Sequence, residues 1–273
     1  MSEIKQTINR LDHHRLTIRI GRNTLSFLAI AAEDKNPIKY EPYVVKSGVS
    51  MAANLREAFK GADLLSAGIT RTRILVDTPV LMTPVELFQE PKMQTMYYHA
   101  FPQNSQDAVF YNVLPELNAV AIFSMNRDLK LVIDDHFQDV QFVAALTPVW
   151  RHLYQRSFTG QRNKLYGYFH DRQVDIFSFQ QNRFKFCNLY ETNRVHDALY
   201  FLLYVWNQLM FNAETDELYL VGSIPDEGRL LEELKKYVQK VYVINPATDF
   251  GDSPVSQIKK MPYDLMTLYA KER

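Results

Sequence analysis

The pattern of apolar and polar positions changes period several times in the first part of the chain. Apolar side chains first alternate with polar ones, as in a strand with one buried face. Polar turns separate this segment from two further strand-like segments. Ser50 then precedes a run of good helix formers that it can cap. We therefore expect strands at 16–20, 24–31, 39–46 and 71–76 and a helix at 51–59, in the order βββαβ.

Two further strands and two helices complete the first part of the chain, at 108–113, 117–124, 126–137 and 147–154. The second part then repeats the order of the first. Three aromatic-rich strands with polar turns then precede a long helix, a strand, a helix and a last strand. These elements are expected at 165–169, 174–179, 184–189, 195–211, 217–221, 228–238 and 240–244, and a short helix at 263–270 ends the chain.

A repeated order of elements predicts two domains of the same kind, although the two copies share little sequence identity. Strands of a meander pair antiparallel, and the strand after each helix can return parallel to the first strand. We therefore expect an α/β fold of two related domains, each a mixed sheet with βββαβα order. The expected domains are residues 11–160 and 161–245, followed by a C-terminal tail with a short helix at 246–273.

Composition and charge exclude several classes of protein. Lys and Arg total 31, as do Asp and Glu, so no net charge attracts nucleic acid or anionic membranes. The single cysteine, Cys187, excludes an internal disulfide and multi-cysteine zinc sites. The longest apolar run, 198–206, has nine residues, whereas a membrane-spanning helix needs about 20. Because residues 1–10 also lack the apolar core of a signal peptide, we expect a cytoplasmic protein with no membrane insertion and no nucleic-acid partner.

Two segments resemble nucleotide-binding motifs of the actin-like (ribonuclease-H-like) ATPase fold. Segment 16–30 resembles the first phosphate hairpin of the pilus-assembly members, with matches at Gly21, Asn23 and Thr24. Segment 219–223 resembles the strand and glycine turn that meets adenosine in this group. The whole chain is similar to this group, which includes actin, sugar kinases and heat-shock chaperones, and to an uncharacterised bacterial family with the same fold.

The chain departs from the pattern that this resemblance implies. The first hairpin of the family carries an acidic residue that helps to hold magnesium, and Arg19 stands at that position. If Asp175 is aligned with the acid that ends the second hairpin motif, Tyr168 replaces the second catalytic acid and His170 replaces a glycine. The resemblance thus implies a degenerate nucleotide cleft at Arg19, Gly21, Asn23, Thr24, Tyr168, His170, Gly222 and Ser223. We expect no catalytic residue, no metal and no cofactor beyond a vestigial ATP site.

Three other features each have two interpretations. Segment 48–52 nearly matches the nucleophile elbow G-x-S-x-G, but Ser50 also suits a helix N-cap. The long helix at 195–211 is apolar nearly all round, which favours burial between layers, although part of it can dock a partner. A basic cluster can bind an anion or an acidic partner, or form a solvated edge. Its members are Arg10, His13, Arg15, Arg19, Arg22, Arg71 and Arg73.

The function expected from these features is that of a non-catalytic, degenerate actin-like protein that acts as a cytoplasmic scaffold or regulatory partner of another protein. One alternative is a nucleotide-binding ATPase or sensor with an altered phosphate site, in which Arg19 contacts phosphate directly. A second alternative is a cell-envelope or pilus-type assembly component.

Overall fold

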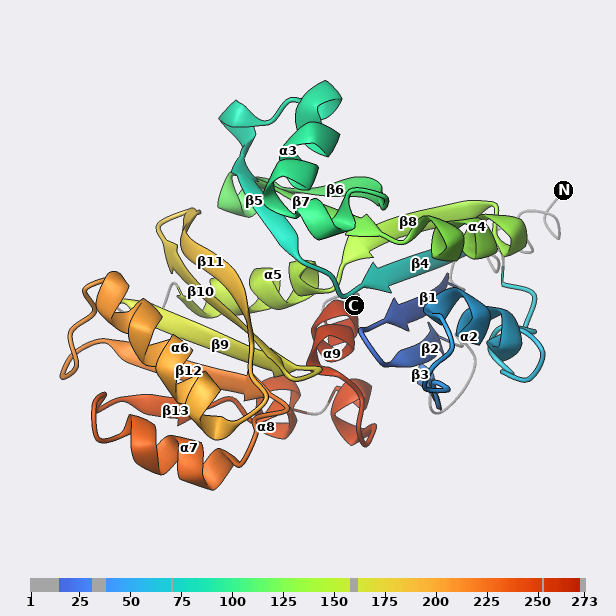
Figure 1. The fold of residues 1–273 in the computed structure, drawn as a ribbon. Coiled ribbons are helices and arrows are strands. Elements are labelled where there is room, and N and C mark those ends of the chain that lie inside the picture. The colour runs from blue at the N-terminus through green and yellow to red at the C-terminus, as the bar shows by residue number, and fades with distance from the viewer. Residues whose placement is uncertain (1–14, 31–37, 70, 158–161, 252, 271–273) are drawn as a thin grey trace, which may run out of the picture. The chain divides into compact units, whose positions relative to one another are not determined.

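The computed structural model describes residues 15–30, 38–69, 71–157, 162–251 and 253–270. Its contacts divide the chain into two compact units (Figure 1). The first unit comprises Met1–Val113, Val120–Thr147 and Asp252–Met261. The second comprises Leu114–Ala119, Pro148–Gly251 and Pro262–Arg273. The expected domains follow other boundaries, because the expectation assigned helix 147–154 to the first domain and made the last helix part of a separate tail.

The first unit is built on a five-stranded mixed sheet in the order β3-β2-β1-β4-β8. The meander β1–β2–β3 is antiparallel, and β4 and β8 lie parallel to β1 and to each other. The strands are β1 (Arg15–Ile20), β2 (Leu25–Ile30), β3 (Ile38–Tyr43), β4 (Arg71–Val76) and β8 (Asp139–Ala144).

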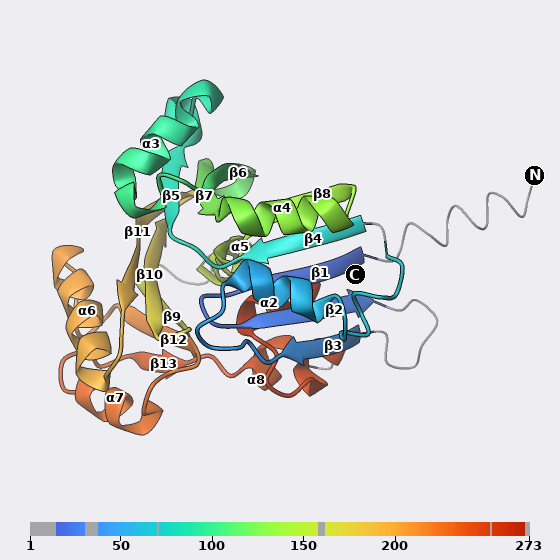
Figure 2. The same ribbon diagram turned by 45° about the vertical axis from the view of Figure 1, so that its right-hand side comes forward.

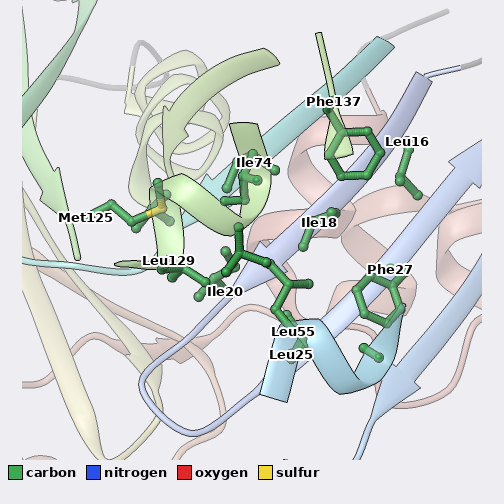
Figure 3. Packing of buried hydrophobic residues seen from close by; sticks show 14 of the residues in the cluster. Leu16, Ile18, Ile20, Leu25, Phe27, Leu55, Ile74, Met125, Leu129 and Phe137 are labelled. Atoms are coloured by element: carbon green, nitrogen blue, oxygen red, sulfur yellow. The ribbon is translucent and has the colours of Figure 1, made fainter. Parts of the chain in front are cut away.

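Helices α2 (Met51–Ala58) and α4 (Arg127–His136) cover one face of this sheet (Figure 2). Leu16, Ile18 and Ile20 of β1 point toward them, as their alternation predicts, and pack with Leu55 of α2 (Figure 3). The remaining β1 positions differ from the prediction of a half-buried strand. Thr17 and four of its five companions in β1 are buried, so both faces of this strand are covered.

An insertion between β4 and α4 forms a second, three-stranded sheet in the order β5-β7-β6. It has its own small core around Tyr97, Val120 and Ile122. The sequence predicts β6 and β7 but not β5 or α3, because 80–100 mixes prolines with an irregular apolar pattern. The insertion contains β5 (Val80–Pro84), α3 (Met93–Ala100), β6 (Ala108–Leu114), β7 (Ala119–Met125) and the 3₁₀ turns η1 (Val85–Leu87), η2 (Glu90–Lys92), η3 (Pro102–Asn104) and η4 (Pro115–Leu117).

The second unit contains a five-stranded mixed sheet in the order β11-β10-β9-β12-β13. Helices α6 and α7 cover one of its faces (Figure 1). Its elements are β9 (Lys164–His170), β10 (Gln173–Gln180), β11 (Arg183–Glu191), α6 (Val195–Gln208), β12 (Glu217–Gly222), α7 (Glu227–Leu234) and β13 (Val241–Val243). Helices α5 (Leu146–Ser157), α8 (Pro246–Phe250) and α9 (Tyr263–Ala270) complete this unit, and the 3₁₀ turn η5 (Pro254–Gln257) belongs to the first unit.

The two large sheets have the same strand order and the same parallel and antiparallel pairs. This agreement confirms the expected α/β fold of two related mixed sheets. Strand β8, which completes the first sheet, is absent from the prediction. Its sequence, Asp139–Ala144, is short and begins with exposed polar positions, so its strand pattern is weak.

Helix α6 differs from the predicted helix at 195–211, which was expected to be buried between layers. Ala198, Leu202, Val205 and Trp206 are buried, but Tyr200 is 61% exposed on the opposite side. Among the described helices, none combines the length and the apolar character that are needed to cross a bilayer.

Candidate functional site

The first predicted hairpin, β1–β2, is closed by a hydrogen bond from the N–H of Gly21 to the carbonyl of Thr24 (2.8 Å). Arg19 is 3% exposed and does not point into solvent. Its Nη1 donates to the hydroxyl of Thr24 (2.8 Å), and its Nη2 lies 3.7 Å from a carboxylate oxygen of Asp77. The structure therefore brings Arg19, Gly21 and Thr24 together, whereas the side chain of Asn23 is exposed.

Asp77 is a member of this site that the sequence analysis missed. It directly follows β4, and its N–H donates to the carbonyl of Ile20 (2.9 Å), which fixes it beside the end of β1. Parallel neighbours β1 and β4 end at the same edge of the sheet, so an acid after β4 reaches a base at the end of β1. In the sequence, the signal for Asp77 was an acidic residue directly after a strongly apolar strand.

The basic cluster is largely paired within the first unit. Arg73 is 8% exposed, and its Nε donates to Gln141 (3.1 Å). Arg71 lies 3.4 Å from a carboxylate oxygen of Asp139. The interpretation as a solvated edge is thus wrong for Arg19 and Arg73, which are buried. Arg10 and His13 lie outside the described residues.

The second predicted hairpin, β9–β10, carries two buried polar pairs on one face. Tyr168 stacks against His170 with ring centroids 4.8 Å apart. His170 Nε2 lies 2.6 Å from an oxygen of Asp175, and the hydroxyl of Tyr168 donates to Asp264 (3.1 Å). The position where the family implies a glycine thus holds a buried imidazole that is paired with a carboxylate.

The predicted adenosine turn follows β12 and lies beside the same end of β9. Gly222 has φ +95°, and a Cβ built on it would lie 2.1 Å from the carbonyl oxygen of Phe169. Ser223 donates its N–H to that same carbonyl (2.8 Å). The glycine is therefore required by the close approach of two backbones within the sheet. Tyr168, His170, Gly222 and Ser223 are adjacent in the second unit, and their nucleotide-binding role stays a prediction.

Two other predicted features have simple structural roles. The Ser50 side chain accepts a hydrogen bond from the N–H of Ala53 (3.2 Å), so Ser50 is the N-cap of α2. Cys187 lies within β11, and burial raises the pKa of its thiol well above its ordinary value. A raised pKa keeps the thiol protonated, which is unfavourable for nucleophilic chemistry.

A polar network that the sequence analysis missed surrounds Asp249 of α8. This carboxylate accepts hydrogen bonds from His152 Nε2 (2.8 Å), from the hydroxyl of Tyr263 (2.6 Å) and from Arg156. Burial alone would raise the pKa of Asp249, but the hydrogen bonds from His152 and Tyr263 outweigh burial and hold this pKa below its ordinary value.

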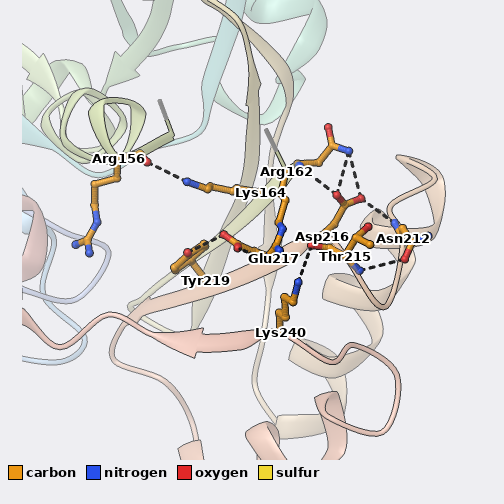
Figure 4. Close-up of polar contacts among 10 residues, drawn as sticks. Arg156, Arg162, Lys164, Asn212, Thr215, Asp216, Glu217, Tyr219 and Lys240 are labelled. Carbon is orange, nitrogen blue, oxygen red and sulfur yellow. Dashed lines mark hydrogen bonds and ion pairs between the residues drawn. The ribbon is translucent and has the colours of Figure 1, made fainter. Parts of the chain in front are cut away.

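A second polar group includes Lys164, which contacts Arg156, and the pair Tyr219 and Glu217 (Figure 4). Lys164 donates to the carbonyl of Arg156 (3.1 Å), and burial lowers the pKa of its ammonium. Tyr219 donates its hydroxyl to Glu217 (2.8 Å). A pocket of about 390 Å³ opens next to these groups, with Arg156, Tyr219, Tyr242, Asn245, Thr248 and Asp249 in its wall. Its residues come from four separate segments, which explains why no sequence pattern predicted it.

Comparison with known proteins places the chain in a family. Residues 4–241 match the model described as "Protein of unknown function (DUF3822)". The chain belongs to the DUF3822 family. None of the functionally curated proteins matches the sequence.

Solved structures confirm the fold of this DUF3822 protein. One is a crystal structure from Bacteroides thetaiotaomicron VPI-5482, which is described as a protein with actin-like ATPase fold and unknown function. Its sequence is 28% identical to this chain, and the two structures superpose with a TM-score of 0.79. The alignment covers 92% of this chain and 98% of that chain. A PilM-PilN type IV pilus biogenesis complex is 12% identical with a TM-score of 0.51, over 93% of this chain and 94% of that chain. The resemblance to the actin-like ATPase fold is thus confirmed, and the likeness to the pilus protein is distant.

Proposed function

We propose that this DUF3822 protein is a non-catalytic member of the actin-like fold that acts as a cytoplasmic scaffold or regulatory partner of another protein. The observation that carries the proposal is the contact of the buried Arg19 side chain with Thr24 and Asp77. It fills the first hairpin with an internally neutralised ion pair, at the position where the resemblance implies a magnesium-binding acid.

The positive charge of the Arg19 guanidinium argues against Mg-ATP chemistry. Magnesium needs hard oxygen ligands, and a guanidinium in the position of the acid repels the cation. The carboxylate of Asp77 lies beside that guanidinium, so binding magnesium there requires breaking the contact with Arg19. Because phosphoryl transfer depends on the placement of metal and phosphate, the arrangement disfavours hydrolysis.

The second hairpin supports the same proposal independently. The imidazole of His170 and the ring of Tyr168 are packed and hydrogen-bonded at positions where the resemblance to actin-like ATPases implies a glycine and an acid. A bulky side chain there prevents close approach of the backbone to phosphate.

The sensor alternative requires a rearrangement of the first hairpin. For Arg19 to contact a phosphate directly, the phosphate must replace the Asp77 carboxylate beside the guanidinium.

A protein partner is the remaining element of the proposal. The distant pilus neighbour is described as a complex with a second protein, which shows that this fold supports protein binding in that system. We extend protein binding to this chain as part of the proposal, with no assignment to a pilus.

The test combines two measurements on the purified protein. Phosphate release from ATP is followed with and without Mg²⁺, and a tagged copy expressed in the native cell is crosslinked and purified with its partners. We expect no magnesium-dependent release above the buffer background and a stoichiometric protein partner. Magnesium-dependent phosphate release by the wild type above the buffer background would overturn the non-catalytic assignment, and the lack of any stoichiometric partner would overturn the scaffold role.

A further inference from the structure

The pocket in the second unit lies at the edge strand β13 and beside α8. Its wall includes Tyr219 of segment 219–223 but none of the residues of the predicted nucleotide site. Its volume of about 390 Å³ is within the range of small-molecule sites. All of its lining residues belong to the second unit. An inference about this pocket is therefore independent of the proposed scaffold function.

One wall of the pocket is the end of an aromatic ladder. Phe177, Tyr166, Tyr219 and Tyr242 occupy paired positions on four adjacent strands. Their rings stack with successive centroid separations of 5.6, 5.5 and 5.2 Å. Tyr242 ends the ladder and is 43% exposed. The last ring therefore offers an aromatic surface to a planar group in the pocket.

The polar side of the pocket presents donors and acceptors without net charge. Arg156 contributes N–H donors, and the carboxylate of Asp249 contributes acceptors directly beside it. Thr248 and Asn245 add a neutral hydroxyl and a neutral amide. An anionic ligand would face Asp249 and a cationic ligand would face Arg156, so the lining favours an uncharged ligand.

The ladder also contains a polar group that the protein leaves unused. The hydroxyl of Tyr166, next to Tyr219 in the ladder, is buried and has no hydrogen-bond partner among the described residues. A buried hydroxyl without a partner is costly, but Tyr166 is absent from the pocket wall, so the proposal below rests on the lining residues alone.

We propose that this pocket binds a small, planar, uncharged ligand whose ring contacts Tyr242 and whose amide-like edge both donates and accepts hydrogen bonds at Arg156 and Asp249. The aromatic wall sets the planar shape, and the adjacent donor and acceptor set the polarity of the edge. Neither property depends on the hairpins of the predicted nucleotide site.

Three isosteric probes separate these requirements: 4-fluorobenzamide, 4-fluorobenzoate and 4-fluorobenzamidine share one ring and differ in charge. Their binding to the full chain is measured by fluorine NMR relaxation over a range of concentrations. We expect the neutral amide to bind with the lowest dissociation constant. Preference for either charged probe, or no binding of the amide, would overturn the proposal.

Amino-acid substitutions test whether the amide binds in this pocket. Tyr242→Leu removes the aromatic surface from an edge position and should weaken binding of the amide about 2- to 10-fold. Tyr237→Leu is the matched control, because Tyr237 is 58% exposed in the same unit and is absent from the pocket wall. Thr248→Val tests the polar side, and a thermal melt of each variant verifies its folding. Equal affinity in wild type and in the folded Tyr242→Leu variant would contradict the proposed site.

Discussion

The two large sheets of this protein share one framework but contain different polar residues at equivalent strand ends. At the end of β1, Arg19 meets an acid that follows β4. At the equivalent end of β9, His170 meets an acid of the neighbouring hairpin strand, Asp175. The comparison teaches that a repeated apolar pattern preserves strand order, whereas a few polar substitutions change what the strand ends can bind.

The first and largest test of this comparison concerns the ion pair in the first unit. Asp77→Ala leaves a buried guanidinium without its carboxylate and should lower the free energy of unfolding by about 3–5 kcal/mol. The double variant Arg19→Met/Asp77→Leu replaces the pair by apolar groups and should recover most of that loss. Urea denaturation measures both. A double variant that is as unstable as Asp77→Ala would show that the pair itself is not the cause.

The last paired position of β12 beside β9 holds Gly222, whereas the last paired position of β4 beside β1 holds Val76. Gly222→Ala should destabilise the protein by about 2–5 kcal/mol, because it combines a positive φ with a clash against the backbone of Phe169. Gly228→Ala is the matched control: a Cβ at Gly228 in α7 meets nothing within 4 Å. We expect the control to be neutral or to stabilise by up to about 1 kcal/mol. Similar losses in both variants would contradict the steric explanation.

The Asp249 network makes the second unit sensitive to pH. The hydrogen-bonded carboxylate has a lowered pKa when folded, so its contribution to stability is present above the pKa of the unfolded chain. That contribution is lost as the pH falls through the folded pKa. Asp249→Asn should cost about 1.5–3 kcal/mol at pH 7 and flatten the acid limb of the stability curve.

The neighbours that set this titration are His152, Arg156 and Tyr263. Glu214→Gln, at an exposed carboxylate of the same unit, serves as the control and should leave the acid limb unchanged. Thermal melts between pH 3 and pH 8 at intervals of about one unit are sufficient to compare these variants. An unchanged acid limb in Asp249→Asn would exclude this network as its source.

The smallest expected effect compares the caps of α2 and α6, the helix that follows the three-stranded meander in each unit. Ser50 accepts from the N–H of Ala53 at the start of α2, whereas Asp197 accepts from the backbone of Asn193 and Arg194 at the start of α6. Ser50→Ala and Asp197→Ala should each cost about 0.5–2 kcal/mol. Chemical denaturation of the two variants tests whether different caps stabilise equivalent helices equally. A loss far above this range at Ser50 would indicate a role beyond capping.

The sequence predicts the framework well because apolar alternation and helix periodicity are local signals. The strands of both meanders and the cap of α2 are recovered in this way. Strand β8 was not predicted because it is short, its first and third positions are polar and exposed, and its partner β4 lies far away in sequence. The insertion elements β5 and α3 escape for a similar reason, since their core forms only within the insertion.

The candidate site is less predictable because its partners are distant in sequence. Arg19 draws attention as a departure from the resemblance, but only the structure pairs it with Asp77. The Asp249 network joins α5, α8 and α9, whose apolar patterns carry no information on polar contacts. Burial of Arg73 likewise depends on a neighbouring strand that the sequence did not reveal.

Nucleotide binding by the intact protein tests the central claim most directly, because the claim is that internal pairs occupy the phosphate hairpins. Melting temperatures are compared with and without millimolar Mg-ATP, in wild type and in Arg19→Met/Asp77→Leu. A ligand at 100 times its dissociation constant stabilises a native state by about 2.7 kcal/mol, which raises the melting temperature by about 2–4 °C in a protein of this size. We predict no reproducible shift in either protein. A shift of that size in wild type that disappears in the double variant would contradict the account and assign Arg19 to phosphate binding.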